Sequence, residues 1–142
     1  MLKSILNFIP QKKCIIFESV PDLSDNTKAV FDEMLKRGLG DRYKFVWLVS
    51  DKNKQFPVYP NTIYIDKNTR INKLKFSWYK FCARCLICCN RFCGTKYSHQ
   101  YSFYLTHGTG IKSLGKYNVP RNIDYVLIGA EPMKEMMARE LK

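Results

Sequence analysis

The sequence contains no long hydrophobic run. Its uninterrupted apolar stretches do not exceed five residues, whereas a helix needs about 20 apolar residues to cross a bilayer. The opening MLKSILNFIP is also too short and too weakly charged for a secretory signal. These absences predict a cytoplasmic protein. Because disulfides are rare in that compartment, the six cysteines are expected to stay reduced.

Linkers, low-complexity tracts and internal repeats are absent as well. The chain has 142 residues, of which 46% are hydrophobic and 14% aromatic. A chain of this size buries about two-thirds of the surface that its unfolded form exposes, which is enough for one core. Residues 1–142 are therefore expected to form a single globular domain.

Acidic residues are scarce relative to basic ones. The chain has 24 Lys and Arg against 12 Asp and Glu, which gives a formal net charge of +12. Such a charge attracts phosphates, nucleic acids and anionic lipid surfaces. The basic residues are scattered from Lys12 to Lys142 rather than gathered into an arm. That distribution disfavours a nucleic-acid-wrapping tail.

Strand-like and helix-like periods alternate along the chain. This alternation predicts an α/β domain with a mostly parallel sheet. The strands are expected at 13–20, 43–50, 62–65, 85–90, 102–106 and 124–130, and the helices at 25–37, from Arg70 to about Cys85, and at 131–142.

The two longer internal helices carry specific expectations. In the first helix, Ser24 or Asp25 can cap the start and Gly38 can end it. In the second helix, one apolar stripe is expected to face the core, with lysines, a serine and an arginine roughly opposite. The stripe consists of Ile71, Leu74, Trp78, Phe81, Cys82 and Cys85.

The stretch FYLTHGTGIKSLGKY (103–117) is the first candidate site. Ligands of open parallel sheets bind beyond the carboxyl ends of the strands, where His107 is expected. A neutral imidazole there could take a proton from an attacking hydroxyl. The surrounding residues could let the backbone approach a phosphate and contact it; they are Gly108, Thr109, Gly110 and Lys112. The alternative is a histidine that bonds to the backbone of a turn.

The stretch FESVPDLSDNTKAVFDEM (17–34) is the second candidate. Glu18 ends the first strand, and the next helix opens with Ser24, Asp25 and Asn26. Helix N-termini attract anions and hydroxyl-rich ligands. The alternative is ordinary helix capping by Ser24 or Asp25.

The cysteine cluster CARCLICCNRFC (82–93) resembles a metal motif only in part. Its first three cysteines fit the ferredoxin spacing C-x₂-C-x₂-C-x₃-C, but the fourth position is Phe92. Cys88 and Cys89 are adjacent in an expected strand, so their side chains should point to opposite faces. The cluster therefore indicates buried structural thiols rather than a metal site, and no cofactor is expected.

Several segments together resemble one known family. FES, SDNTKAVFDEM, YKFVWLVSD, LTHGTGIKSLGKY and IDYVLIGA, in this order and spacing, are similar to the front half of the catalytic region of CDP-glycerol glycerophosphotransferases. These enzymes are the teichoic-acid polymerases and primases of the bacterial cell envelope. The resemblance implies the N-terminal, acceptor-side half of a GT-B glycosyltransferase-like architecture. It also implies that the donor-binding second domain is absent from this chain.

The family motif nearest to the first candidate is W-H-G-T-P-L-K. His107, Gly108, Thr109 and Lys112 match it, and the resemblance implies that His107 is the catalytic base. The departures from the family pattern are Thr106 for tryptophan, Gly110 for proline, Ile111 for leucine, and Thr27 for a proline that often follows S-D-N.

The function implied is transfer of glycerol phosphate, or a related polyol phosphate, from a CDP-linked donor to a lipid-linked glycan or polymer. The chain alone is expected to be inactive, and peripheral on the anionic inner face of the bacterial membrane. Two alternatives stay open: the N-terminal domain of a nucleotide-sugar GT-B glycosyltransferase, and a non-catalytic basic module that binds membrane or RNA through the helix around Lys73, Lys80 and Arg84.

Overall fold

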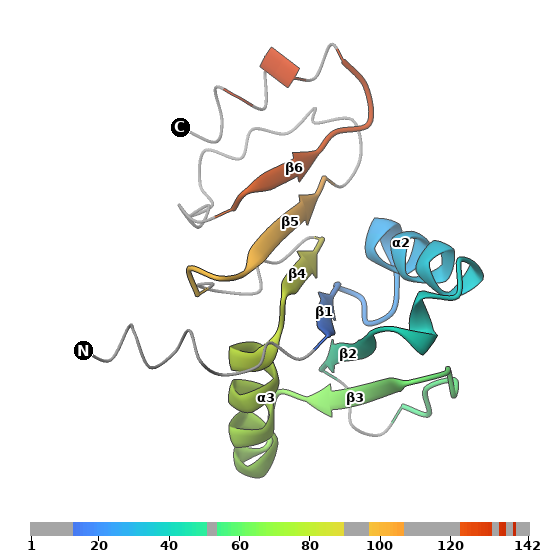
Figure 1. Cartoon of the computed structure of the whole chain (residues 1–142), viewed down its shortest axis with the longest axis vertical. Coiled ribbons are helices and arrows are strands. Elements are labelled where there is room, and N and C mark those ends of the chain that lie inside the picture. Colours follow the sequence, from blue (N-terminus) through green and yellow to red (C-terminus); the bar gives the residue numbers. More distant parts are fainter. Residues whose placement is uncertain are drawn as a thin grey trace.

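The computed structural model describes residues 13–50, 54–89, 97–106, 123–131, 134–135 and 138. These residues form one parallel sheet with strand order β3-β2-β1-β4-β5-β6 (Figure 1). The elements are β1 (Cys14–Glu18), α2 (Asp25–Lys36), η1 (Leu39–Asp41), β2 (Lys44–Val49), β3 (Thr62–Asp66), α3 (Arg70–Cys82), β4 (Cys85–Cys88), β5 (Tyr101–Leu105) and β6 (Tyr125–Leu127).

Helices α2 and α3 cover opposite faces of the sheet (Figure 1). On the α2 side, Phe31 packs edge-on against Phe17 and Phe45, with ring centroids 5.4 Å from each. On the α3 side, Ile16, Val46 and Leu86 form a second, aliphatic cluster. Because β1 is central and buried on both faces, its sequence is continuously apolar up to Glu18. The prediction of an α/β, Rossmann-like fold is confirmed.

Helix α2 ends as its sequence predicts. Arg37 is the C-cap residue, and Gly38 follows with φ of 71°. A side chain in this left-handed region would be strained, and glycine avoids that strain. The Gly38 N–H donates to the carbonyl of Leu35 at 2.9 Å, which satisfies one of the last helical carbonyls.

Helix α3 is rotated relative to the prediction. Phe76 and Tyr79 pack against the core, whereas Ile71, Leu74 and Trp78 are exposed. The predicted inward stripe was therefore wrong for these three, although Cys82 is buried. The physical reason is that α3 has apolar side chains on two arcs, and a period of 3.6 does not tell which arc meets the sheet.

The other boundaries differ by a few residues. The strand expected at 124–130 is reduced to β6, and η1 was not predicted. The helix expected at 131–142 lies largely outside the described residues, of which Lys134, Glu135 and Ala138 are helical.

Candidate functional site

The carboxyl edge of the sheet gathers polar groups from several strands. From β1 the chain adds β2 and β3 toward one edge of the sheet, and from β4 it adds β5 and β6 toward the other. The direction of strand order therefore reverses between β1 and β4. Ligands of open α/β sheets bind outside the carboxyl ends at such a point. Glu18 ends β1, and Thr106 follows β5 at the same edge. The edge is thus the candidate site.

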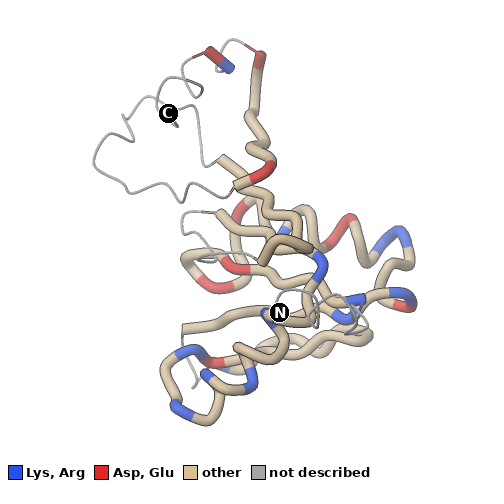
Figure 2. The backbone as a smooth tube through the Cα atoms, turned by 60° about the vertical axis from the view of Figure 1, so that its left-hand side comes forward, with Lys and Arg blue, Asp and Glu red and all other residues tan. Residues whose placement is uncertain are grey.

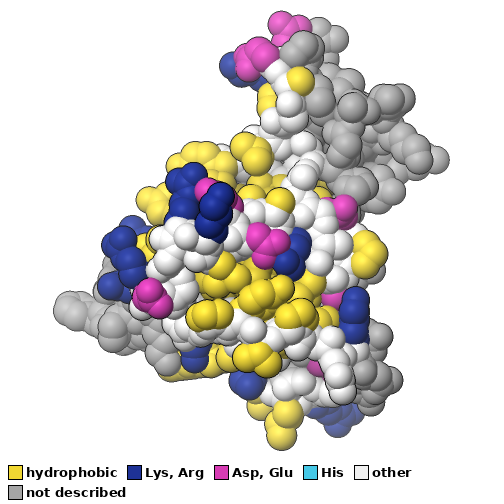
Figure 3. All heavy atoms as spheres, turned by 90° about the vertical axis from the view of Figure 1, so that its right-hand side faces the viewer, with side chains coloured by type: hydrophobic (Ala, Val, Ile, Leu, Met, Phe, Trp, Pro, Cys, Tyr) yellow, Lys and Arg dark blue, Asp and Glu magenta, His cyan; other side chains and the backbone are white. Residues whose placement is uncertain are grey.

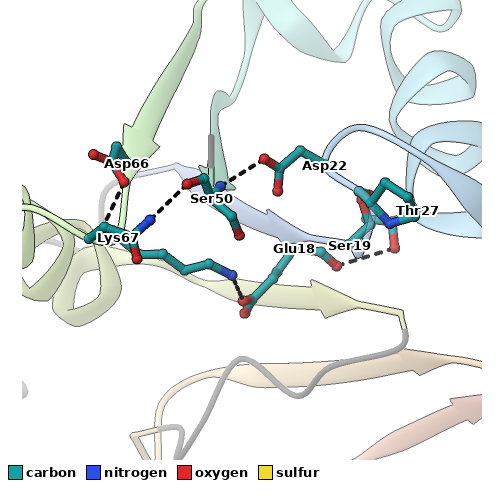
Figure 4. Close-up of polar contacts among 9 residues, drawn as sticks. Glu18, Ser19, Asp22, Thr27, Ser50, Asp66 and Lys67 are labelled. Carbon is teal, nitrogen blue, oxygen red and sulfur yellow. Dashed lines mark hydrogen bonds and ion pairs between the residues drawn. The ribbon is translucent and has the colours of Figure 1, made fainter. Parts of the chain in front are cut away.

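Glu18 forms an ion pair across the end of β2. Its Oε1 accepts a hydrogen bond from the Nζ of Lys67, which follows β3, at 2.5 Å (Figure 4). The Glu18 side chain is 8% exposed and that of Lys67 is 21% exposed. A carboxylate this deeply buried requires a paired cation. Glu18 therefore already has a charged partner and links β1 to the loop that begins α3.

The turn between β1 and α2 is held by its own hydroxyl groups. The Ser19 hydroxyl donates to the carbonyl of Pro21 at 2.8 Å and accepts from the Ser24 N–H at 3.1 Å. The Ser24 hydroxyl also donates to Pro21, at 2.5 Å, and makes no capping hydrogen bond. Ser24 is thus the N-cap residue of α2, as one of the two expected alternatives has it, but its hydroxyl does not cap the helix because it is turned back into the turn.

Backbone strain marks the same turn. Leu23 and Asp25 have φ of 54° and 56°, in the left-handed backbone region that residues other than glycine rarely adopt. The carboxylate of Asp22 accepts the Ser50 N–H at 2.7 Å and so ties the turn to the end of β2 (Figure 4). Strained residues held by surrounding hydrogen bonds concentrate at functional sites.

Asn26 connects the second candidate segment to the first. Its Nδ2 donates to the carbonyl of Thr106 at 2.6 Å, although the two residues are 80 positions apart. Thr106 is also fixed to β6, because its N–H and its hydroxyl both donate to the carbonyl of Leu127. The start of α2 is therefore bonded to the residue that directly precedes His107.

The structure places only part of the predicted site. Glu18, Ser24, Asp25 and Asn26 lie at the carboxyl edge of the sheet. His107, Gly108, Thr109, Gly110 and Lys112 lie outside the described residues.

Sequence reasoning missed the polar residues at the end of β3 and directly after it. Asp66 Oδ1 accepts the Asn68 N–H at 2.8 Å, and the Asn68 amide donates to the Ser50 carbonyl at 2.7 Å. The other carboxylate oxygen of Asp66 is buried and has no hydrogen-bond partner within the described part of the chain. The signal was the run TIYIDKN, in which charged and polar residues directly follow the strand expected at 62–65.

The cysteines among the described residues are buried in the core or, for Cys85, packed against it. Cys88 belongs to the cluster on the α3 side of the sheet and Cys89 to the cluster on the α2 side, which confirms that they point to opposite faces. Burial, with the nearby Cys88 thiol, raises the pKa of Cys85 to about 12. Burial, with the charge of Asp25, raises the pKa of Cys89 to about 11. Both thiols are therefore protonated and unreactive at neutral pH.

No three His, Cys, Asp or Glu side chains gather as a metal site would require, within the residues that the structure describes. The same residues include no helix that is long and apolar enough to cross a membrane.

Solved structures similar to the chain include those of the wall teichoic acid polymerase TagF. One TagF structure matches with a TM-score of 0.76 and 18% sequence identity. The structure of a TagF variant matches with a TM-score of 0.77 and 17% sequence identity. A third, from a variant crystal soaked with CDPG, matches with 0.76 and 17%. Each match covers 98% of this chain and 39% of the TagF chain. This likeness shows the fold. A search of curated proteins found no match.

The family comparison covers almost the entire sequence. The model of CDP-Glycerol:Poly(glycerophosphate) glycerophosphotransferase matches residues 1–139. That span includes both candidate segments and every strand of the described sheet. The chain therefore belongs to the CDP-glycerol:poly(glycerophosphate) glycerophosphotransferase family.

Proposed function

We propose that this chain supplies the acceptor-side half of a GT-B-type transferase. The enzyme moves glycerol phosphate, or a related polyol phosphate, from a CDP-linked donor to a hydroxyl of a membrane-bound glycan or polymer. The chain spans 39% of the TagF chains that it resembles. A donor-binding half, on the same or another polypeptide, completes the site.

In this proposal His107 acts as the general base. Its imidazole takes the proton of the acceptor hydroxyl while the hydroxyl oxygen attacks the donor phosphorus. A new phosphorus–oxygen bond forms, the bond to the bridging oxygen breaks, and CMP leaves with the electron pair. Gly108 and Gly110 let the backbone approach the phosphate, which Thr109 and Lys112 contact.

The observation that carries the proposal is the hydrogen bond from Asn26 to Thr106. It joins the strained β1–α2 turn to the strand end from which residue 107 follows, at the edge where parallel sheets bind ligands. Two of the segments that carry the family resemblance thus meet at Asn26 and Thr106. Glu18 supports this edge through Lys67, while Ser24 and Asp25 line it.

A nucleotide-sugar glycosyltransferase is the second candidate, because the same architecture serves sugar nucleotides. The test supplies the chain and its donor-binding half with CDP-glycerol or with sugar nucleotides, and a lipid-linked acceptor. Mass spectrometry should detect acceptor extended by glycerol phosphate, with CMP released in equal amount. Extension by a sugar alone would favour the second candidate, and no extension with any of these donors would reject both.

A further inference from the structure

One carboxylate oxygen of Glu18 has no partner within the described residues. Its Oε1 accepts the hydrogen bond from Lys67 Nζ, whereas no described residue donates to its Oε2. The fully buried side-chain atoms without a hydrogen bond in the described part of the chain are Trp47 Nε1, Asp66 Oδ2 and Thr69 Oγ1. Glu18 Oε2 is not among them, so the 8% of the Glu18 side chain that is exposed includes this oxygen. It is therefore a hydrogen-bond acceptor that a ligand can reach at the carboxyl edge of the sheet.

The Glu18–Lys67 pair differs from the other ion pairs between described residues. Those pairs join residues three or four positions apart, and their side chains are 25% to 81% exposed; they are Lys28–Asp32, Arg37–Glu33 and Lys134–Glu131. Figure 3 likewise shows acidic and basic side chains close together on an open surface. Glu18 and Lys67 are instead 49 positions apart and enclosed at the strand ends. Because apolar residues often replace a buried pair without loss of stability, stability alone does not explain this pair.

The backbone of Glu18 is fixed by two neighbouring elements. Its carbonyl accepts the N–H of Cys89, which follows β4, at 3.1 Å and the hydroxyl of Thr27, in the first turn of α2, at 3.5 Å. Thr27 directly follows Asn26, which bonds to Thr106. The Glu18 carboxylate is thus held in one position, on the edge where the segment with the proposed base begins. A polar group held this rigidly is suited to recognise one group of a ligand.

The chemistry of the pair determines which ligand group it can bind. An ionised carboxylate accepts hydrogen bonds and cannot donate them, so Oε2 repels a phosphate and binds a donor such as a hydroxyl. Lys67 is 21% exposed, and its ammonium, which has three protons to donate, makes one hydrogen bond with the described residues. A hydroxyl both donates and accepts. One ligand hydroxyl can therefore donate to Oε2 and accept from Nζ at the same time.

A phosphate group and a metal ion match the pair less well. Lys and Arg occur at many positions of the described backbone in Figure 2, so a phosphate can meet cations that no buried carboxylate neutralises. A metal ion needs several ligands, and no three His, Cys, Asp or Glu side chains gather in a suitable way within the described ranges. A hydroxyl is therefore the ligand group that matches both members of the pair.

We propose that Glu18 recognises the hydroxyl beside the reacting hydroxyl of the acceptor, and that Lys67 positions Glu18 for this contact. The acceptor is then a polyol or sugar unit with two neighbouring hydroxyls. One attacks the donor phosphorus, and the other binds Oε2 and Nζ. Glu18 is thus a specificity-determining residue, and it disfavours acceptors with a single hydroxyl. This role rests on the proposed function, which brings the acceptor to this edge.

Two acceptors separate this role from the transfer reaction itself. In the completed enzyme, with CDP-glycerol as donor, the first acceptor ends in glycerol phosphate. The second is its deoxy analogue, in which hydrogen replaces the hydroxyl beside the reacting one. For the parent, kcat/KM should be about 10–100-fold higher with the first acceptor, because the second lacks a hydrogen bond to a charged group. Glu18→Leu/Lys67→Met removes both polar groups without leaving a buried charge, and should bring the two values of kcat/KM close together.

Two further comparisons show whether the effect is specific. Glu33→Leu/Arg37→Met is the matched control, since it removes an exposed ion pair from α2 and should keep the parent ratio of kcat/KM. Lys67→Met should lower the ratio, and Lys67→Arg should restore most of it, because a guanidinium also binds a carboxylate. A merely structural role would lower kcat/KM equally for both acceptors and leave the ratio unchanged. Melting temperatures show that each variant is folded.

Binding without turnover gives a second measurement. Glycerol phosphate, added to the parent chain, should shift the NMR signals of the Ser19 and Cys89 amides, and its deoxy analogue should shift them less at equal concentration. Equal kcat/KM for both acceptors, an unchanged ratio in Glu18→Leu/Lys67→Met, or equal shifts with both ligands would each overturn the role of Glu18. The first two results would leave the proposed function intact. Extension of neither acceptor would reject the proposed function, and the NMR titration would then decide the role of Glu18 alone.

Discussion

Asn26 and Thr106 are hydrogen bonded across the carboxyl edge of the sheet. The Asn26 amide donates to the Thr106 carbonyl at 2.6 Å. The bond runs from the start of α2 to the end of β5, past the end of β4, which lies between β1 and β5 in the sheet. Asn26 therefore acts, in the proposed function, as a positioning residue for the segment that begins at His107.

Asn26→Ala should affect both stability and turnover. Loss of one intramolecular hydrogen bond lowers the free energy of unfolding by about 0.5–1.5 kcal/mol. In the completed enzyme, kcat should fall while donor KM changes little, because the base is displaced. Asn26→Asp should be worse than alanine, since a carboxylate would face the Thr106 carbonyl. Urea denaturation and steady-state kinetics measure the two effects.

Asn68→Ala is the control for this prediction. The Asn68 amide makes the same type of bond, to the Ser50 carbonyl at 2.7 Å. Asn68→Ala should lower the free energy of unfolding by a similar amount but leave kcat close to that of the parent. If both variants lower kcat equally, Asn26 has only a structural role.

The Glu18–Lys67 ion pair should matter for stability. Lys67→Met leaves the buried Glu18 carboxylate without its cation, which should cost about 1–3 kcal/mol in the free energy of unfolding. Glu18→Gln/Lys67→Met should recover part of that loss, because no unpaired charge remains. Urea denaturation of the single and double variants measures the coupling.

Lys28→Met is a matched comparison, since Lys28 pairs with Asp32 one helical turn away at 2.6 Å on a more exposed surface. That pair is expected to contribute only about 0.3–0.5 kcal/mol. If Lys28→Met and Lys67→Met lower the free energy of unfolding equally, burial does not make the Glu18–Lys67 pair more important.

The buried thiols predict alkaline destabilisation. The pKa of Cys85 is raised from 9.0 to about 12, and that of Cys89 to about 11. Above pH 9 the unfolded chain loses these protons while the folded chain keeps them. Stability present below pH 9 is thus lost progressively as the pH rises toward 11–12, by at most about 1.4 kcal/mol per pH unit for each thiol.

Urea denaturation from pH 7.5 to 10 tests this dependence. The variant Cys85→Ala/Cys89→Ala should be less stable at neutral pH because it loses packing, but its stability should fall less steeply above pH 9. A parallel pH dependence of parent and variant would show that other groups cause the alkaline loss.

The sequence was most informative where one physical cause determines the structure. The buried runs predicted β1, β2 and β4, and Gly38 predicted the end of α2. Helix α3 was placed correctly but its inward face was not, because apolar residues lie on both arcs and contact with the sheet decides between them.

In the candidate site, too, local sequence predicted some features, and contacts between distant segments decided the others. Position at strand ends predicted that Glu18 and Asn26 lie at one edge of the sheet. Their partners, Lys67 and Thr106, are 49 and 80 positions away. Such pairings follow from strand order, and local sequence carries little information about which parallel strands become neighbours.

His107→Ala is the sharpest test of the catalytic proposal. If the imidazole is the base, kcat of the completed enzyme should fall about 10²–10⁴-fold, while the melting temperature and donor KM stay nearly unchanged, because proton removal belongs to the transition state. Lys112→Ala should act more mildly and raise KM, since a phosphate contact already exists in the ground state. If His107 is only a turn residue, its alanine variant should instead lose thermal stability and keep its turnover per folded molecule. A stable, fully active His107→Ala enzyme would end the proposal that this histidine is the base.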